Sequence, residues 1–249
     1  MTTAVLLLLA GVAAGLSGSM AGLASLFSYP ALLAVGLPPV VANQTNTIAL
    51  AVSSAGSIAS SRPELRGQGG RVLRLIPLTV LGGVIGGALV LVTPSETFAL
   101  IVPFLVAFAS LVLLRPPKAA PAGEGRRDGR PDPLTVLGTI LIGVYSGYFG
   151  AAAGVLMLAL LSHLLADTLV RVNAVKNVLL GASNAVAAIG FIVFGTVVWT
   201  AALPLMIGLF VGNYAGPAIA RRLPPAVLRV GIAVAGLVLA VVLFVQAVS

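Results

Sequence analysis

Long apolar runs dominate the chain, and they constrain its fold more than any other feature. They cover approximately residues 4–35, 40–60, 72–92, 98–114, 134–162, 172–193, 198–219 and 226–248. Only 8% of the residues are charged and the mean hydropathy is +1.14, whereas about a quarter of the residues of a soluble domain are charged. Such a chain cannot cover a water-exposed surface, so the sequence predicts an all-α integral membrane protein in a lipid bilayer.

The charged and sulfur-containing residues limit the chemistry that the chain can perform. Cysteine is absent, which excludes disulfides and thiol catalysis, and one histidine with six acidic residues offers little for a metal site. We therefore expect no metal and no cofactor. The net charge of +8 comes from basic residues in short connections between apolar segments. That placement is typical of membrane orientation, and we expect no nucleic-acid partner.

A linker rich in proline, glycine and charge divides the chain into similar halves. We expect transmembrane repeats over 1–114 and 134–249, joined by the linker 115–133. Four glycines of the first half recur at the same spacing in the second half, and later glycines and prolines follow in the same order. The matched glycines are Gly11, Gly15, Gly18 and Gly22 with Gly143, Gly147, Gly150 and Gly154, then Gly82 and Gly86 with Gly208 and Gly212.

The positions of lysine and arginine favour one topology. If every apolar segment crosses once, the basic loops fall on both sides of the membrane. If the first and fifth segments each enter and leave on the same side, every basic loop falls on one side, as the positive-inside rule requires. This arrangement places the linker 115–133 in the cytoplasm of a bacterial inner membrane and both termini outside.

The lengths of the first and fifth segments agree with this topology. Segments 4–35 and 134–162 would each be about 45 Å long as one helix, against a hydrocarbon core of about 30 Å. A re-entrant hairpin of two short helices fits, with the glycines at its tip; a single tilted and kinked helix is the alternative. The hairpins make the two repeats inverted, each with three further spanning helices, which is typical of secondary transporters.

The two hairpin tips are candidate anion sites. Helix N-termini carry unpaired N–H groups and partial positive charge, and small residues let an anion approach the backbone. Close helix packing is the alternative role for these glycines. The candidates at the two tips are Ser17, Gly18, Ser19, Gly22, Gly150, Ala151 and Gly154.

Polar residues at the start of two spanning segments complete the predicted site. Asn43, Gln44, Thr45 and Asn46 form an unbroken polar run, and Lys176 with Asn177 lies at the matching place in the second half. Lys176 is either a counter-charge for an anion or a side chain that reaches the headgroups. Deeper polar residues either extend a polar path or bond to their own helices; they are Ser53, Ser54, Ser57, Ser183 and Asn184.

The remaining charged residues give weaker signals. Arg62, Glu64 and Arg66 are expected in a solvated loop, and Asp167 and His163 at a solvated boundary or in a proton relay. A further alternative arises from "GLSG" at 15–18, which matches the nucleophile motif of rhomboid proteases, with Ser17 and His163 as a dyad. Ser17 lies near the predicted midplane and His163 near the boundary, so we expect no enzyme.

Both halves of the sequence resemble the TauE/SafE sulfite exporter family. The resemblance rests on "GLSGSMAGLASLFSYPALLAVGLPPVVANQTNTIAL" in the first half, and on "GVYSGYFGAAAGVLMLALL" and "VNAVKN" in the second. It departs from the family pattern at Ala31, where leucine is usual, and at the alanines 151–153. The resemblance implies a permease that moves sulfite or organosulfonates, driven by protons rather than ATP.

Together, these observations predict a secondary-active transporter with two inverted repeats and a midplane anion site. The expected partners are a small sulfur-containing oxyanion, protons as coupling ion, the bilayer and a second copy of the chain in a homodimer. A passive anion channel is the alternative within transport.

Overall fold

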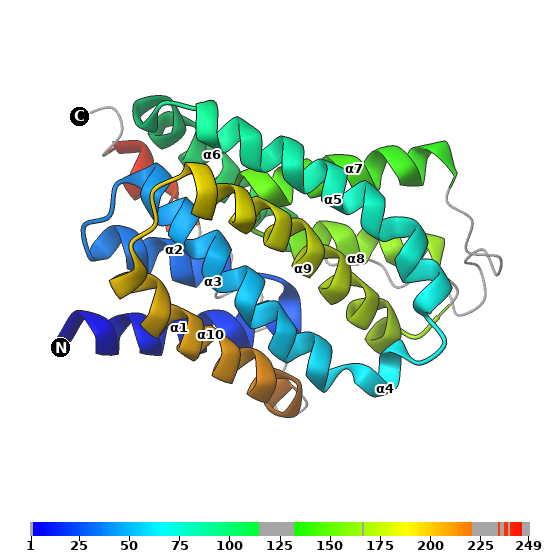
Figure 1. Cartoon of the computed structure of the whole chain (residues 1–249). Coiled ribbons are helices and arrows are strands. Elements are labelled where there is room, and N and C mark those ends of the chain that lie inside the picture. The colour runs from blue at the N-terminus through cyan, green and yellow to red at the C-terminus, as the bar shows by residue number, and fades with distance from the viewer. Residues whose placement is uncertain are drawn as a thin grey trace.

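A computed structural model describes residues 2–114, 132–165 and 167–220, together with 234, 237, 238 and 240–245. This part of the chain is built from α-helices joined by short connections (Figure 1). The expected linker and much of the eighth apolar segment lie outside the described residues. The helices are α1 (Thr2–Ala21), α2 (Ser25–Ala34), α3 (Pro39–Ser60), α4 (Arg62–Leu65), α5 (Gly69–Val92), α6 (Ser95–Leu114), α7 (Pro133–Tyr148), α8 (Ala153–Leu164), α9 (Leu169–Phe194) and α10 (Trp199–Ala220).

Prolines and one capping aspartate set the starts of the interior helices. Pro39 and Pro133 occupy the first turns of α3 and α7, where a missing N–H costs nothing. The side chain of Asp132 accepts a hydrogen bond from the Thr135 N–H at 2.7 Å, which satisfies one of the free amides at the start of α7. For the first seven apolar segments, the predicted boundaries agree with the observed helices to within a few residues.

Several helices are long and apolar enough to cross a bilayer. Within the described residues these are Thr2–Ser19, Gly69–Val92, Ser95–Val112 and Leu169–Phe194, and shorter apolar helices accompany them. The expected all-α membrane protein is confirmed. Helix α3 is not among these spans, although it lies beside α9 and α10 in the bundle (Figure 1), and it carries the polar run and the serines singled out above.

The first and fifth apolar segments are each broken into two helices that fold back. Helix α1 ends at Ala21 and α2 begins at Ser25, and Gly22 between them has a φ of +71°. In the other hairpin, a Cβ built on Gly138 of α7 would lie 3.3 Å from the Leu160 methyl groups of α8, which is the contact expected of antiparallel neighbours. A hairpin, rather than one kinked helix, is present in both places.

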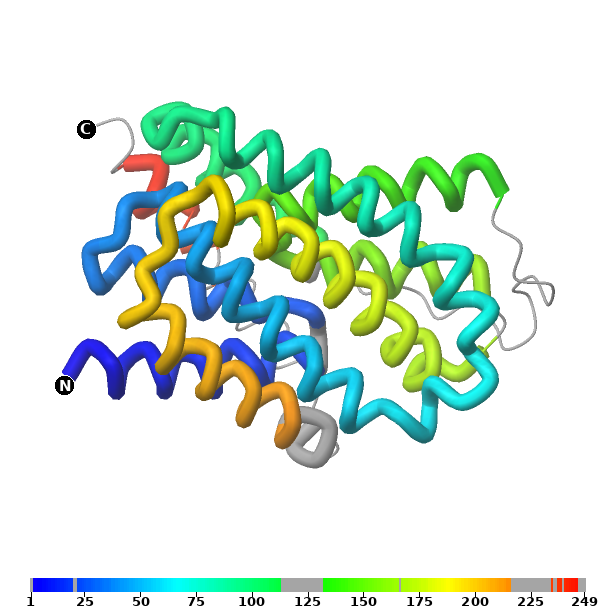
Figure 2. The backbone as a smooth tube through the Cα atoms, in the orientation of Figure 1, coloured from blue at the N-terminus to red at the C-terminus, as the bar shows by residue number. Residues whose placement is uncertain are grey.

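The two hairpin tips meet in the middle of the molecule. Helices α1 and α7 enter from opposite ends of the bundle and run toward each other (Figures 1 and 2). A Cβ on either Gly22 or Gly154 would lie 2.5 Å from the Cα of the other, so only glycine fits on both sides of this contact. The tips therefore touch through backbone atoms.

Each hairpin packs against a long helix through paired glycines. At the first hairpin, a Cβ on Gly11 or Gly15 of α1 would lie 2.9–3.0 Å from the backbone of Gly208 or Gly212 of α10, respectively. At the second, a Cβ on Gly82 or Gly86 of α5 would lie 2.8–2.9 Å from the backbone of Gly143 or Gly147 of α7. These are the glycines that the repeat pattern matched. Each contact thus joins a hairpin of one half to a long helix of the other half. This symmetry supports two repeats, although the repeat boundaries themselves stay a prediction.

Candidate functional site

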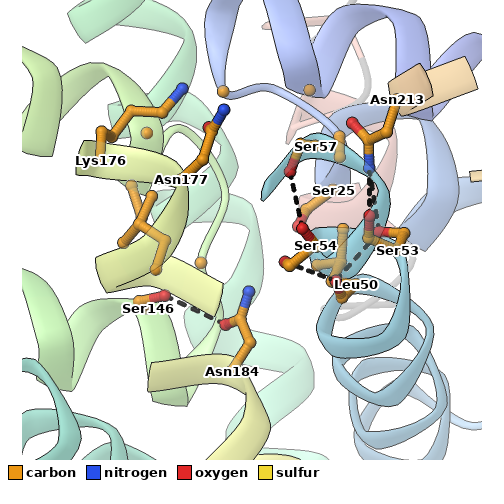
Figure 3. Close-up of a pocket in the computed structure, with 17 residues that line it drawn as sticks. Ser25, Leu50, Ser53, Ser54, Ser57, Ser146, Lys176, Asn177, Asn184 and Asn213 are labelled. Carbon is orange, nitrogen blue, oxygen red and sulfur yellow. Dashed lines mark hydrogen bonds between the residues drawn. The ribbon is translucent and has the colours of Figure 1, made fainter. Parts of the chain in front are cut away.

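A cavity of about 80 Å³ lies where the two tips meet (Figure 3). A cavity needs about 10–15 Å³ of this measure to hold one water, so the space suits a few waters or a small ion. Both hairpins and helices α3, α9 and α10 contribute to its wall. The lining residues are Gly18, Gly22, Ala24, Ser25, Leu50, Ser53, Ser54, Ser57, Ser146, Gly150, Ala153, Gly154, Lys176, Asn177, Leu180, Asn184 and Asn213.

Lys176 is the charged residue of this wall. Its side chain comes from α9 and is 1% exposed, and its Nζ has no hydrogen-bond partner among the described residues. A buried amine without a partner is costly. A side chain that reached the headgroups would show neither property. The counter-charge role stays a prediction.

The hairpin glycines line the cavity, but two of their amides are already bonded. The Gly22 N–H donates to the Gly18 carbonyl at 2.8 Å, and the Gly150 N–H donates to the Tyr145 carbonyl at 2.9 Å. Residues 18–21 belong to helix α1 itself. In the first turns of α2 and α8, which begin at Ser25 and Ala153, the amides of Leu26, Phe27, Ala153 and Val155 are bonded to nearby carbonyls. The amides of Ser25 and Gly154, two residues of the cavity wall, are left for a ligand.

The predicted polar run 43–46 lies outside the cavity wall. Its side chains are buried. They form hydrogen bonds with backbone groups of other segments and with the Ser25 hydroxyl instead. Asn43 Nδ2 donates to the Tyr148 carbonyl at 2.8 Å, and Gln44 Oε1 accepts from the Thr196 N–H at 2.8 Å. Asn46 Nδ2 contacts Ser25 Oγ at 3.3 Å, and Thr45 Oγ1 accepts from the Val198 N–H at 3.4 Å. These residues tie α3 to both hairpins and to the α9–α10 connection.

Three tip residues also lie outside the cavity wall. Ser17 and Ser19 donate to carbonyls of their own helix, at Ala14 (2.9 Å) and Leu16 (3.1 Å), and Ala151 is fully buried. The structure does not bring Ser17 and His163 together. His163 is exposed on α8, nine residues beyond the Gly154 contact and roughly 14 Å along the helix axis. The dyad needed for a protease is thus not assembled.

Sequence reasoning missed three polar residues of the wall. Ser25, Ser146 and Asn213 each stand alone among apolar neighbours, so no local pattern marks them. Asn213 stands one residue after Gly212, whose packing against α1 places it beside the tip. Of the deeper residues, Ser53, Ser54, Ser57 and Asn184 line the cavity, whereas Ser183 donates to the Gly143 carbonyl. No group of three or more metal-ligating side chains occurs in the described residues.

A polar clasp closes one end of the bundle, where the basic loop 61–70 meets the start of α9. Asp167 Oδ2 accepts hydrogen bonds from Arg71 (2.8 Å) and Gln68 (2.9 Å), and its Oδ1 lies 3.1 Å from Arg171 Nε. Arg171 also donates to the Arg66 carbonyl at 3.0 Å. The clasp joins the two halves of the chain, and Asp167 is a bonded carboxylate rather than a solvated boundary residue.

The clasp makes stability sensitive to acid. Burial opposes ionisation of Asp167, but the bonds from Thr168, Arg71 and Gln68 and the charge of Arg171 outweigh it and hold the pKa of Asp167 below its ordinary value of 3.8. The stabilisation is thus present above the ordinary pKa and is lost as the pH falls through the lowered one. We expect Asp167→Asn to lower stability by about 1–2 kcal/mol at neutral pH, measured by thermal unfolding in detergent.

The control for the clasp is Glu96→Gln, at an exposed carboxyl at the start of α6, which should unfold like the wild type. The difference between Asp167→Asn and the wild type should shrink in acid. An equal difference at neutral pH and well below the ordinary pKa would contradict the assignment.

Comparisons with known proteins agree with this architecture. Residues 7–243 match the family described as "Sulfite exporter TauE/SafE". The chain is 31% identical over 205 residues to "Probable membrane transporter protein YfcA" of Escherichia coli K12, covering 82% of this chain and 75% of the relative. It is 28% identical over 240 residues to "Probable membrane transporter protein ORF9" of a Sinorhizobium species, covering 92% and 89%.

The search of solved structures gives no significant match. The family match nevertheless spans nearly the whole chain and includes both hairpins and every residue of the cavity wall. This chain is a multi-pass membrane transporter that belongs to the sulfite exporter TauE/SafE family.

Proposed function

We propose that this transporter is a secondary-active permease that exports small sulfur-containing anions, such as sulfite or organosulfonates, and is coupled to protons. The observation that carries the proposal is the buried Lys176 amine, which has no partner in the described structure and lines a cavity between two hairpin tips. An anion would supply the missing partner. The family description, which names sulfite export, supports the same substrate class.

The wall of the cavity supplies the other contacts that an oxyanion needs. Asn177 and Asn184 lie on the same helix as Lys176 and present amides to the cavity. The starts of α2 and α8 add the N–H groups of Ser25 and Gly154, which have no backbone partner, and the positive ends of two helix dipoles. The polar run 43–46 acts indirectly in this proposal, because it holds α3 against the hairpins.

The placement of the hairpins at opposite ends supports alternating access as the mechanism of this proposal. The two tips touch through Gly22 and Gly154, so one half can rock against the other around the bound anion. The clasp at Asp167 closes the end that carries Arg62, Arg66, Arg71 and Arg171. We place this basic end in the cytoplasm and the N-terminus outside, in a bacterial inner membrane. The expected homodimer stays a prediction without support from the described residues.

Proteoliposomes that contain the full chain test the proposal. Sulfite should accumulate against its own gradient when a proton gradient is imposed, and a protonophore should abolish the accumulation. A passive channel for the fully ionised anion would only equilibrate sulfite across the bilayer. Absence of any sulfite, sulfate or organosulfonate flux would overturn the proposed function, as would transport that ignores the proton gradient.

A further inference from the structure

The two sides of the cavity differ in hydrogen-bonding character. One side comes from α9 and α7, and the other from α3 and α10 (Figure 3). A carbonyl oxygen can only accept, so each serine bonded to a carbonyl has used its own proton and offers only oxygen lone pairs to a ligand. This rule decides whether most of the polar side chains of the wall offer a hydrogen-bond donor or an acceptor to a ligand.

The α3 side presents acceptors. Ser53 and Ser54 donate to the Leu50 carbonyl at 2.9 and 2.8 Å, and Ser57 donates to the Ser54 carbonyl at 3.0 Å. The Ser53 hydroxyl therefore accepts from Asn213 Nδ2 at 3.0 Å, and this bond fixes the Asn213 amide. Its Oδ1 is left directed toward Gly18 and the cavity, 3.5 Å from the position of a Gly18 Cβ.

The α9 side presents mainly donors, although the Ser146 oxygen on α7, whose proton goes to Asn184, is an acceptor among them. Lys176 offers its Nζ, and Asn184 accepts from the Ser146 hydroxyl through Oδ1 at 3.1 Å, which leaves its Nδ2 free toward the cavity. Figure 3 shows the nitrogen atoms of Lys176, Asn177 and Asn184 on this side and the oxygen atoms of Ser54, Ser57 and Asn213 across from them. Ser25, at the start of α2, accepts from Asn46 and belongs to neither side.

A fully ionised oxyanion has only acceptor atoms. It would satisfy the donors of α9 but would leave its remaining oxygens facing the oxygen lone pairs of α3 and α10. An oxyanion that keeps one proton satisfies both sides, because its O–H can donate to the acceptor side. The cavity of about 80 Å³ limits this ligand to a small inorganic species or a short organic acid.

We infer that the cavity selects a monoprotonated oxyanion, with its charged oxygens on Lys176 and Asn184 and its O–H on the acceptor oxygens of α3 and α10. The inference rests on the proposed function and adds the protonation state of the substrate. The proton then crosses on the anion, in the same direction, and passes to water on the far side, so the membrane potential acting on the remaining negative charge drives export. No acidic side chain lines the cavity within the described structure, and none is needed for this form of coupling.

Binding of sulfite and sulfate to the purified full chain tests the inference. Sulfite takes up a proton near neutral pH, whereas sulfate stays fully ionised, so sulfate reports any titration of the protein itself. Lys176 is the titratable group on the described wall. The helices packed against α9 carry other charged or titratable residues, and none of these lines the cavity: Arg62 and Glu64 on α4, Arg71 and Arg74 on α5, Tyr145 and Tyr148 on α7, and His163 on α8. Calorimetry under nitrogen, which prevents oxidation of sulfite, measures both affinities at pH values on either side of the sulfite ionisation.

We expect sulfite to bind about tenfold more tightly than sulfate at the lower pH, the effect of one satisfied hydrogen bond in place of an unsatisfied one. Its apparent affinity should fall as the pH rises, while that of sulfate stays flat. Equal affinities for the two anions, or sulfite binding that is independent of pH, would overturn the inference and leave the proposed function standing. No binding of either anion would overturn both.

Serine variants provide a second test. Ser54→Ala with Ser57→Ala removes two acceptors of the wall and should reduce the ratio of sulfite to sulfate affinity several-fold. Ser60→Ala is the matched control, because Ser60 makes the same bond within α3, to the Ser57 carbonyl at 3.0 Å, but does not line the cavity. A ratio that is unchanged in the double variant would count against the inference, whatever the absolute affinities.

Discussion

Replacing Lys176 with methionine is expected to abolish anion transport while leaving the protein folded. The Nζ of Lys176 lies inside the cavity without a partner in the described structure, and the loss of a buried charged contact to a ligand costs at least about 2 kcal/mol. Apparent affinity for sulfite should therefore fall by about 30-fold or more. The measurement is sulfite flux into proteoliposomes together with calorimetric binding.

The stability of Lys176→Met separates a functional role from a structural one. Methionine has a similar length and needs no hydrogen-bond partner, so the substitution removes an unsatisfied buried group and should leave the unfolding temperature unchanged or raise it. Arg62→Met, at an exposed position on α4, is the control and should transport normally. Normal transport by Lys176→Met would refute the anion site, and unfolding of this variant would show that Lys176 is structural.

Much of the architecture follows from the positions of a few charges. Arg62, Arg66, Arg71 and Arg171 lie at one end of the bundle, as the charge distribution over the loops predicts, and the clasp joins the last three. That distribution requires segments 4–35 and 134–162 to return to the side from which they entered, and both do. Glycine spacing alone does not distinguish a tip from a packing face, and the structure uses glycine for both, at Gly22 and at Gly11.

The side chains of the site were predictable only in part. Lys176 stood out because a lysine inside an apolar segment is costly. The polar run 43–46 gave an equally strong signal, yet its residues satisfy buried backbone groups such as the Thr196 N–H and the Tyr148 carbonyl. The sequence alone cannot distinguish a ligand-binding role from a structural role. Both roles require buried polar atoms, and they differ only in which partner the fold places beside those atoms.

Asn213 shows why the rest of the site needs a three-dimensional structure. A single asparagine in an apolar helix carries no periodic signal, and its role depends on the glycine contact that brings α10 against α1. The same is true of Ser146, which fixes the Asn184 amide at a separation of 38 residues. The acceptor and donor sides of the cavity are therefore products of tertiary packing.

Alanine at the tip contact is expected to destabilise the whole bundle. In Gly22→Ala the new Cβ would lie 2.5 Å from the Gly154 Cα, and the residue also has a φ of +71°. Overpacking costs about 1–3 kcal/mol and a left-handed conformation about 1–2 kcal/mol, so the loss should be about 2–5 kcal/mol. Gly154→Ala meets the same contact without a positive φ and should lose about 1–3 kcal/mol.

Two other glycines separate the cost of the steric contact from the cost of the left-handed conformation. Gly36 has a φ of +88° but nothing within 4 Å of its Cβ position, so Gly36→Ala should show only the conformational cost. Gly190 lies in helix α9 with open space around it, so Gly190→Ala should be neutral or stabilising by up to about 1 kcal/mol. Thermal unfolding in detergent ranks the four variants. If Gly22→Ala were no less stable than Gly36→Ala, and Gly154→Ala no less stable than Gly190→Ala, the two hairpin tips would not be in contact, and the cavity between them would lose its basis.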